Sequence, residues 1–162
     1  MIETKRLILR PLTSNDAYKC WENIFHDHDV LESFMANYQE EYNEHCIDKL
    51  LTLKYFYAVC LKDSQEFIGI IFITDMDNNI PEIGYAYGKK YWHQGYASEA
   101  LIAYSKYLND EGYHSQTSEH FAENPISGKV MEKAMMKYYA TKENAIEYHG
   151  KLHDLLCYRI EY

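Results

Sequence analysis

The segment Tyr91-Trp92-His93-Gln94-Gly95-Tyr96-Ala97-Ser98-Glu99-Ala100 is the most informative part of the chain, because a small-residue turn separates a strand pattern from an amphipathic helix pattern. A helix that begins near Gly95 directs unpaired backbone N–H groups and the positive end of its dipole toward the turn, which suits a phosphate. Further along, Asn124-Pro125-Ile126-Ser127 again places a polar residue before a helix pattern. Two such helix starts, each preceded by a strand, predict one site for an anionic cofactor.

The rest of the chain predicts a single domain, residues 1–162, in which strands and helices alternate. Hydrophobic periodicity and turn residues predict strands over residues 6–10, 55–61, 66–74, 80–88, 114–121, 138–148 and 152–161, and helices over 13–25, 43–53, 95–112 and 124–137. The segment between the first two helices shows no regular pattern. We expect the α/β (α+β) class, with a mixed, mostly antiparallel sheet of about seven strands flanked by about four helices.

The formal net charge of -9 argues against a nucleic-acid-binding protein, because such proteins need a basic face. It favours a cationic partner. An anionic cofactor would then be held locally by backbone N–H groups and a few basic side chains. The candidates are Lys89, Lys90, Lys129 and Lys133.

No apolar run is long enough to span a bilayer and no signal-peptide pattern follows Met1, so we expect a cytoplasmic protein that does not bind membranes. Its four cysteines, Cys20, Cys46, Cys60 and Cys157, are far apart and show no zinc-ligand spacing. We therefore expect reduced thiols and no metal site. The sequence does not distinguish a monomer from a homodimer.

Large and small residues alternate along the strand pattern of residues 80–88. One face carries Ile83, Tyr85 and Tyr87, and the other carries only Gly84, Ala86 and Gly88. A strand with one small-residue face allows another group to approach its backbone closely.

The order of these elements resembles the GNAT superfamily of acetyl-CoA-dependent N-acyltransferases along nearly the whole chain, and more narrowly its ribosomal-protein N-terminal acetyltransferase (RimJ/RimL-like) branch. The segments that carry the resemblance are Glu3-Thr4-Lys5-Arg6-Leu7-Ile8-Leu9-Arg10-Pro11-Leu12, Glu82-Ile83-Gly84-Tyr85, Gly95-Tyr96-Ala97-Ser98-Glu99-Ala100, Asn124-Pro125-Ile126-Ser127 with Glu132-Lys133, and Gly150 with Asp154. The resemblance implies acetyl-CoA as co-substrate and direct acetyl transfer to a primary amine.

The resemblance also implies where the cofactor binds. The segment Trp92 to Ala97 would wrap the pyrophosphate, and the strand around Ile83 to Tyr87 would lie along the pantetheine arm. The implied cofactor-binding residues are Ile83, Tyr85, Trp92, His93, Gln94, Gly95, Tyr96, Ala97, Asn124, Ser127 and Lys133. Gly95 and Ala97 have a purely structural alternative in helix-to-sheet packing, and Asn124 has one as an N-cap.

The candidate catalytic residues are Ser127, Tyr85 and Glu82. Ser127 lies in the first turn of the predicted helix, where its hydroxyl could protonate the departing thiolate or remain merely solvated. Tyr85 and Tyr138 are other candidate proton donors. Glu82 resembles the acidic residue that serves as a base in such enzymes, although a carboxylate at a strand end is often only solvated.

Two residues depart from the family pattern. His93 and Met135 stand where glycine is usual, and only glycine adopts positive φ freely. A non-catalytic acyl-CoA-binding module is therefore an alternative to the enzyme, and a purely structural partner protein is a third. The acceptor would be a cationic amine, either a peptide N-terminus or a small molecule. An acidic lip for it could come from His26, Asp27, His28, Asp29, Glu40, Glu41, Glu44 and His45.

Overall fold

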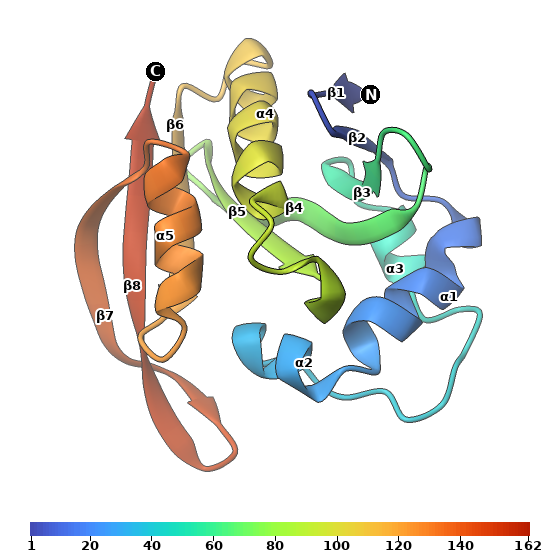
Figure 1. Ribbon diagram of the computed structural model, residues 1–162. Coiled ribbons are helices and arrows are strands. Elements are labelled where there is room, and N and C mark those ends of the chain that lie inside the picture. The colour runs from blue at the N-terminus through green and yellow to red at the C-terminus, as the bar shows by residue number, and fades with distance from the viewer.

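The computed structural model describes residues 1–162, and its strands form one sheet in the order β1-β2-β3-β4-β5-β6-β8-β7 (Figure 1). The strands are β1 (Ile2–Glu3), β2 (Leu7–Pro11), β3 (Phe56–Leu61), β4 (Phe67–Asp77), β5 (Ile80–Tyr87), β6 (Ser115–Phe121), β7 (Lys137–Tyr148) and β8 (Lys151–Glu161). The helices are α1 (Ala17–Cys20), α2 (His28–Phe34), α3 (Asp48–Leu51), α4 (Tyr96–Asp110) and α5 (Pro125–Lys133). The α/β class predicted from the sequence is confirmed.

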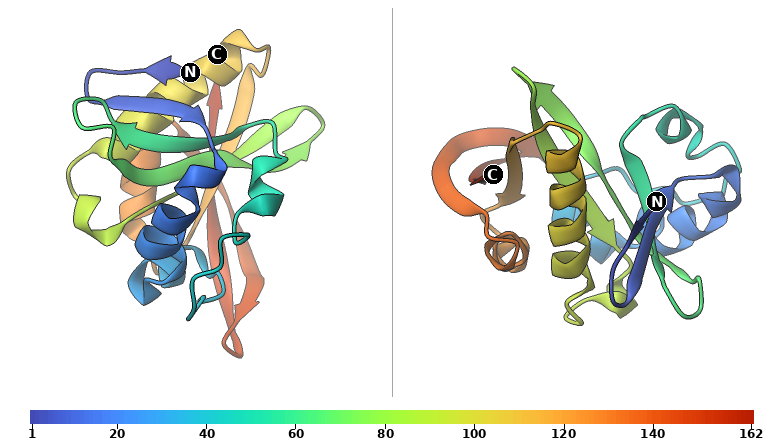
Figure 2. Two further views of the ribbon diagram at one scale, coloured as in Figure 1. Left: turned by 90° about the vertical axis from the view of Figure 1, so that its right-hand side faces the viewer. Right: turned by 90° about the horizontal axis from the view of Figure 1, so that it is seen from above.

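Helices cover both faces of the sheet (Figure 2). On one face, α4 buries Leu101, Tyr104 and Leu108 and α5 buries Met131 in the larger apolar core. Because these residues of α4 recur at three-and-four spacing, they form one stripe that packs on the strands. On the other face, α1 and α2 contribute to a second core that includes Val30.

The sheet contains one parallel pair, β5 and β6, and all other neighbouring strands are antiparallel. The parallel pair is joined only at Glu82 and Thr117. Beyond this point the two strands have no paired residues, although each is fully paired on its outer side. The sheet is therefore split at its centre, between the carboxyl ends of β5 and β6.

Several boundaries differ from the sequence-based expectation. The seven predicted strands are present, and the short β1 is an additional one. The strand predicted over 66–74 continues to Asp77 as β4, so the turn before β5 consists only of Asn78 and Asn79. The helix predicted over 43–53 is reduced to α3, and α5 ends at Lys133 rather than near residue 137. None of the helices has the length and apolar character needed to cross a membrane.

Helix α2 lies in the segment for which the sequence predicted no regular structure. The side chain of Asp27 accepts hydrogen bonds from the N–H groups of Asp29 and Val30, at 3.0 and 3.2 Å, and so caps the helix. Val30 and Leu31 are its buried residues. A helix of seven residues shows too little periodicity to stand out among the surrounding charged residues.

Candidate active site

A cavity of about 700 Å³ opens where β5 and β6 diverge. Its walls come from β5, β6, the turn before α4 and the first turns of α5. It is lined by Glu82 and by every implied cofactor-binding residue except Gln94, namely Ile83, Tyr85, Trp92, His93, Gly95, Tyr96, Ala97, Asn124, Ser127 and Lys133. The structure thus brings together residues from three separate parts of the sequence.

The turn before α4 exposes a run of backbone donors. None of the N–H groups from His93 to Ser98 donates a backbone hydrogen bond within the protein. Gly95 precedes the helix with a φ of 79°, a conformation that favours glycine. Because α4 has 15 residues, its dipole adds a positive potential at the same point. The turn is therefore built to receive an anion.

His93 and Met135 both adopt the left-handed conformation, with φ of 60° and 65°. These are the two positions where the sequence lacks the expected glycine, so the backbone keeps the shape that glycine would allow. His93 lines the cavity, whereas Met135 lies beyond the end of α5 and is 72% exposed. The fold therefore accommodates both residues at the cost of local backbone strain.

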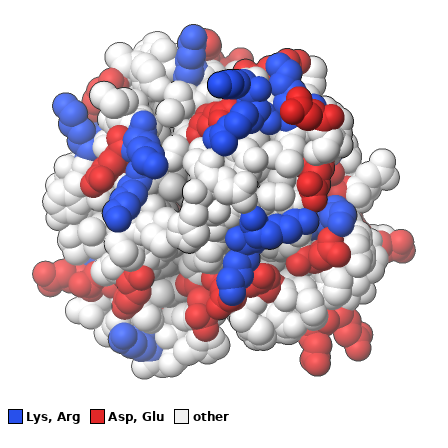
Figure 3. Space-filling model, viewed as in Figure 1, with Lys and Arg blue, Asp and Glu red and all other residues white.

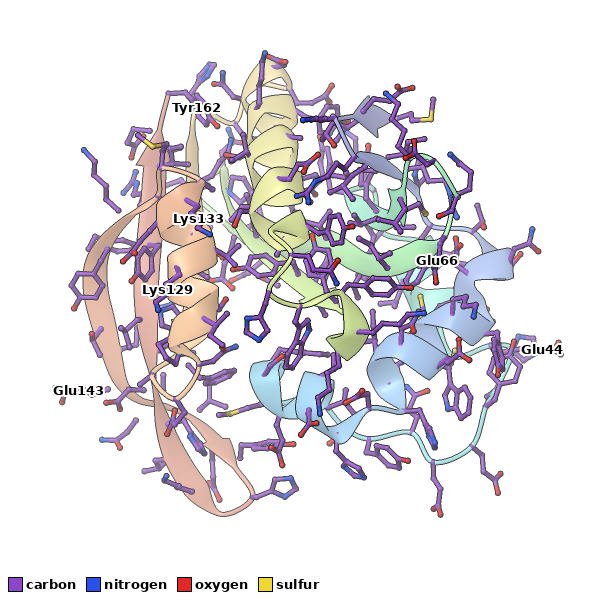
Figure 4. The ribbon with its side chains drawn as sticks, in the orientation of Figure 1. Glu44, Glu66, Lys129, Lys133, Glu143 and Tyr162 are labelled. Carbon is purple, nitrogen blue, oxygen red and sulfur yellow. The ribbon has the colours of Figure 1, made fainter.

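Two of the four candidate lysines lie at the cavity. Lys129 and Lys133 line it and lie one helical turn apart on α5 (Figure 4). Lys89 and Lys90 do not line it, and each forms an ion pair with a surface carboxylate. On the face shown in Figure 3, Lys and Arg groups border a region without charged side chains.

The edge of β5 that faces the split carries unpaired backbone groups. The Ile83 carbonyl accepts a hydrogen bond from Ser118 of β6 at 2.7 Å, and the Tyr87 carbonyl accepts one from the Trp92 indole at 2.7 Å. Backbone groups two residues apart in a strand point to the same side, so the Tyr85 N–H also faces the split. It lies past the last paired residue and is a candidate donor to an oxyanion.

Tyr85 and Ser127 are in direct contact inside the cavity. Their hydroxyl oxygens are 2.8 Å apart, and the Tyr85 hydroxyl also lies 3.2 Å from the Ser127 carbonyl oxygen. Burial raises the pKa of Tyr85, so its phenol stays protonated. Tyr138, the other candidate, bonds to Thr141 on exposed β7 and does not line the cavity.

Asn124 occupies the N-cap position of α5, as the structural alternative expected, but its side chain accepts no capping hydrogen bond from the helix. Its side-chain nitrogen instead donates to the carbonyl of Ser33 in α2, at 3.2 Å. Ser33 and Phe34 of α2 also line the cavity, but the lip candidates His26, Asp27, His28, Asp29 and His45 do not. The more distant Glu40, Glu41 and Glu44 do not line it.

Glu82 lies on the face of β5 opposite Tyr85. Its carboxylate accepts a hydrogen bond from the Thr74 hydroxyl at 2.6 Å. Burial raises the pKa of Glu82, the Thr74 hydrogen bond opposes this, and the nearby Glu119 raises it again. Glu119 projects from β6, pairs with Lys142 and also lines the cavity. A carboxyl group with a raised pKa is suited to accept a proton near neutral pH.

Gly84 is small for a reason within the chain. A Cβ on Gly84 would lie 2.5 Å from the Thr74 methyl group, so a neighbouring strand fills the space beside it. Packing within the sheet therefore explains Gly84, and its small size does not indicate the approach of a ligand. A ligand would instead meet the split edge of β5.

Two buried polar atoms in the cavity lack partners: the Tyr87 hydroxyl and Nε2 of His120. His120 Nδ1 lies 2.8 Å from the Phe121 carbonyl, an acceptor, and so carries a proton; in the neutral ring Nε2 is then an acceptor. Buried polar groups are normally hydrogen-bonded, so both atoms point to a polar occupant. Tyr87 belongs to the strand that was expected to lie along the pantetheine arm, whereas His120 was not predicted from the sequence, because only the fold brings it to the cavity.

No group of three or more His, Cys, Asp or Glu residues has the arrangement needed to hold a metal ion. The four cysteines are free thiols. Gln94, the remaining implied cofactor residue, turns its side chain back to the Lys90 carbonyl at 2.8 Å. Its own carbonyl is held by Arg6, at 3.0 Å.

A sequence model of the acetyltransferase (GNAT) domain matches residues 6–137. The chain belongs to the GNAT acetyltransferase family. This family membership agrees with the open turn before α4, where the resemblance places the cofactor pyrophosphate. No curated protein sequence matches the chain.

Solved structures of GNAT acetyltransferases have the same fold. One from Bacillus anthracis is 27% identical, with a TM-score of 0.86 over 99% of this chain and 97% of that chain. The Salmonella typhimurium enzyme that modifies the N-terminal serine of ribosomal protein L7/L12 is 16% identical, with a TM-score of 0.85 over 98% and 96%. RimL, a ribosomal L7/L12 α-N-protein acetyltransferase solved with coenzyme A, is 18% identical, with a TM-score of 0.81 over 98% and 95%.

Proposed function

We propose that this GNAT acetyltransferase transfers an acetyl group from acetyl-CoA to the primary amine of a cationic acceptor, with a peptide N-terminus as the first candidate. The observation that carries the proposal is a single cavity with unpaired N–H groups at one end and the Tyr85–Ser127 pair further inside. The pyrophosphate would bind the turn from His93 to Ser98. Residues 1–162 would act as one catalytic domain.

The pantetheine arm would lie along the split edge of β5. Its two amide groups offer the donors and acceptors that the buried Tyr87 hydroxyl and His120 Nε2 lack. The thioester would then reach Tyr85, whose N–H faces the same side of the strand. This placement leaves both substrates in one cleft, so that the attack becomes a local reaction.

In the proposed reaction the amine nitrogen attacks the thioester carbonyl carbon. The Tyr85 N–H stabilises the oxyanion, the C–S bond breaks, and Ser127 or Tyr85 gives a proton to the departing thiolate. Glu82 takes the proton lost by the amine, directly or through water. No step requires a covalent enzyme intermediate.

The acceptor would enter from the face of the sheet that carries Glu82 and Glu119. Both carboxylates line the cavity, and their charge favours the approach of an ammonium group. An α-amine has a reference pKa of about 7.7 against about 10.4 for lysine, so it loses its proton more readily. This difference favours a peptide N-terminus over a side-chain amine.

The test is release of thiol from acetyl-CoA in the presence of matched acceptors. A short peptide with a free N-terminus and no lysine should support turnover, whereas the same peptide with an acetylated N-terminus should not. Turnover only with lysine side chains or small amines would reject the peptide N-terminus but keep the enzyme.

The alternative of a non-catalytic acyl-CoA-binding module rests on strained His93 in the cofactor turn. It predicts that acetyl-CoA raises the melting temperature while no amine causes thiol release. Absence of any stabilisation by acetyl-CoA would contradict both the enzyme and the module. The cytoplasmic location remains a prediction from the sequence.

A further inference from the structure

Arg6 lies directly before β2, and its side chain reaches the turn before α4. Its Nη1 donates to the Gln94 carbonyl at 3.0 Å, and its Nε donates to the Glu99 carboxylate at 2.6 Å. The guanidinium carbon lies 4.5 Å from the centre of the Tyr96 ring. We propose that Arg6 is a positioning residue that sets the backbone of the cofactor turn, an inference that rests on the proposed function.

The orientation of one peptide group links Arg6 to the cavity. In a trans peptide the C=O of one residue and the N–H of the next point in opposite directions. Arg6 holds the Gln94 carbonyl but does not line the cavity, whereas Gly95 does. The Gly95 N–H therefore points away from Arg6, toward the place where the pyrophosphate would bind.

This peptide needs an external restraint because of the residue that follows it. Gly95 has no side chain, and a Cβ placed on it would meet only Arg6 Nη2, at 3.5 Å. Glycine adopts many backbone conformations, so the peptide would otherwise rotate easily. The hydrogen bond from Arg6 keeps one orientation before the cofactor arrives and lowers the entropy cost of binding.

Glu99 fixes Arg6 in place. It lies in the first turn of α4 and accepts hydrogen bonds from the Thr4 hydroxyl at 2.6 Å and from the Arg6 N–H at 2.9 Å. Burial alone would raise the pKa of Glu99, but these bonds and the Arg6 guanidinium hold it below its ordinary value. The charge of Arg6 is thereby neutralised, so Arg6 acts through the turn rather than as a free cation for the phosphate.

The experiment compares two acetyl donors, acetyl-CoA and S-acetylpantetheine, which lacks the pyrophosphate. Arg6→Ala should raise the KM and Kd for acetyl-CoA by about tenfold, the equivalent of about 1.4 kcal/mol, with kcat unchanged. The KM for S-acetylpantetheine should stay the same. Arg6→Lys keeps the charge but cannot bond to both the Gln94 carbonyl and the Glu99 carboxylate. Its KM for acetyl-CoA should therefore lie between those of the wild type and Arg6→Ala.

Arg10→Ala is the matched control. Arg10 lies in β2, the strand that directly follows Arg6, and pairs with Asp16 at 2.7 and 2.8 Å, away from the cavity. Its loss should lower the melting temperature without changing the ratio of the two KM values. The positioning role would be overturned if Arg6→Ala raised the KM equally for both donors, or did not raise the KM for acetyl-CoA. A wild-type protein that neither binds acetyl-CoA nor transfers acetyl would instead refute the proposed function.

Discussion

The two strand-to-helix junctions of the site have similar sequences but present different chemistry. Between β5 and α4, the backbone itself is exposed, with free N–H groups from His93 to Ser98. Between β6 and α5, Asn124 is used to hold α2, and the functional group is the Ser127 side chain. A polar or glycine residue before a helix therefore does not predict by itself whether backbone or side chain will meet a ligand.

The largest expected effect comes from a substitution that blocks the turn between β5 and α4. Gly95→Asp should weaken acetyl-CoA binding by more than about a hundredfold, because it adds a negative charge beside the pyrophosphate and strains a backbone at a φ of 79°. Isothermal calorimetry with acetyl-CoA measures this. Gly150→Asp is the control, since Gly150 also has positive φ, 72°, but faces open space. An unchanged Kd in folded Gly95→Asp would remove this turn from the site.

The second junction should affect turnover rather than binding. Ser127→Ala and Tyr85→Phe should each lower kcat by about a hundredfold if they share one proton transfer, with little change in the Kd for acetyl-CoA. Because the two hydroxyls act as a pair, the double variant should be little worse than the poorer single variant. Tyr138→Phe should have no effect. Full additivity would mean that the two hydroxyls act separately.

The comparison also separates what the sequence could predict from what it could not. The sequence marks His93 and Met135 as positions where glycine is usual, but only the structure shows that both keep the left-handed backbone that glycine would allow. The partner of Asn124 does not follow from the sequence, since Ser33 lies 91 residues away and only the folded sheet brings them together. The contact of Arg6 with Gln94, across 88 residues, was hidden for the same reason.

The same limit applies within the cavity. Tyr85 and Ser127 were selected as separate candidates, but their contact depends on how α5 packs over β5. His120 gave no signal, because a single histidine in a strand is usually structural. Local pattern thus predicts element order well, while pairings between distant side chains require the tertiary structure.

A third prediction concerns the face opposite Ser127. If Glu82 is the base, kcat/KM for an α-amine should fall as the pH drops through the pKa of Glu82, which burial and Glu119 raise above the usual glutamate value. Glu82→Gln should be about tenfold slower above this pH and should lose that limb of the profile. Glu119→Gln should shift the limb to lower pH, because it removes a neighbouring negative charge. A profile unaltered by Glu82→Gln would assign the base elsewhere.

The smallest effect concerns the strain at the two non-glycine positions. The left-handed conformation costs a non-glycine residue about 1 to 2 kcal/mol, and glycine removes this strain. Glycine also has a larger conformational entropy in the unfolded state, which offsets about 0.5 to 1 kcal/mol of the gain. Met135→Gly should therefore raise the free energy of unfolding by up to about 1 kcal/mol, which denaturant unfolding can measure, with no change in acetyl-CoA affinity.

His93→Gly isolates the strain in the cofactor turn. If His93→Gly raises the free energy of unfolding as much as Met135→Gly does, the imidazole does not stabilise the turn, and the turn simply tolerates the strain. If only Met135→Gly raises the free energy of unfolding, side-chain contacts of His93 stabilise its conformation. The acetyl-CoA affinity of His93→Gly should then be lower than that of the wild type. Since the free N–H groups remain in either case, the change in Kd should stay below about tenfold, far less than for Gly95→Asp. A larger loss of acetyl-CoA affinity would mean that the His93 side chain, rather than the backbone N–H groups, is the principal cofactor contact at this junction.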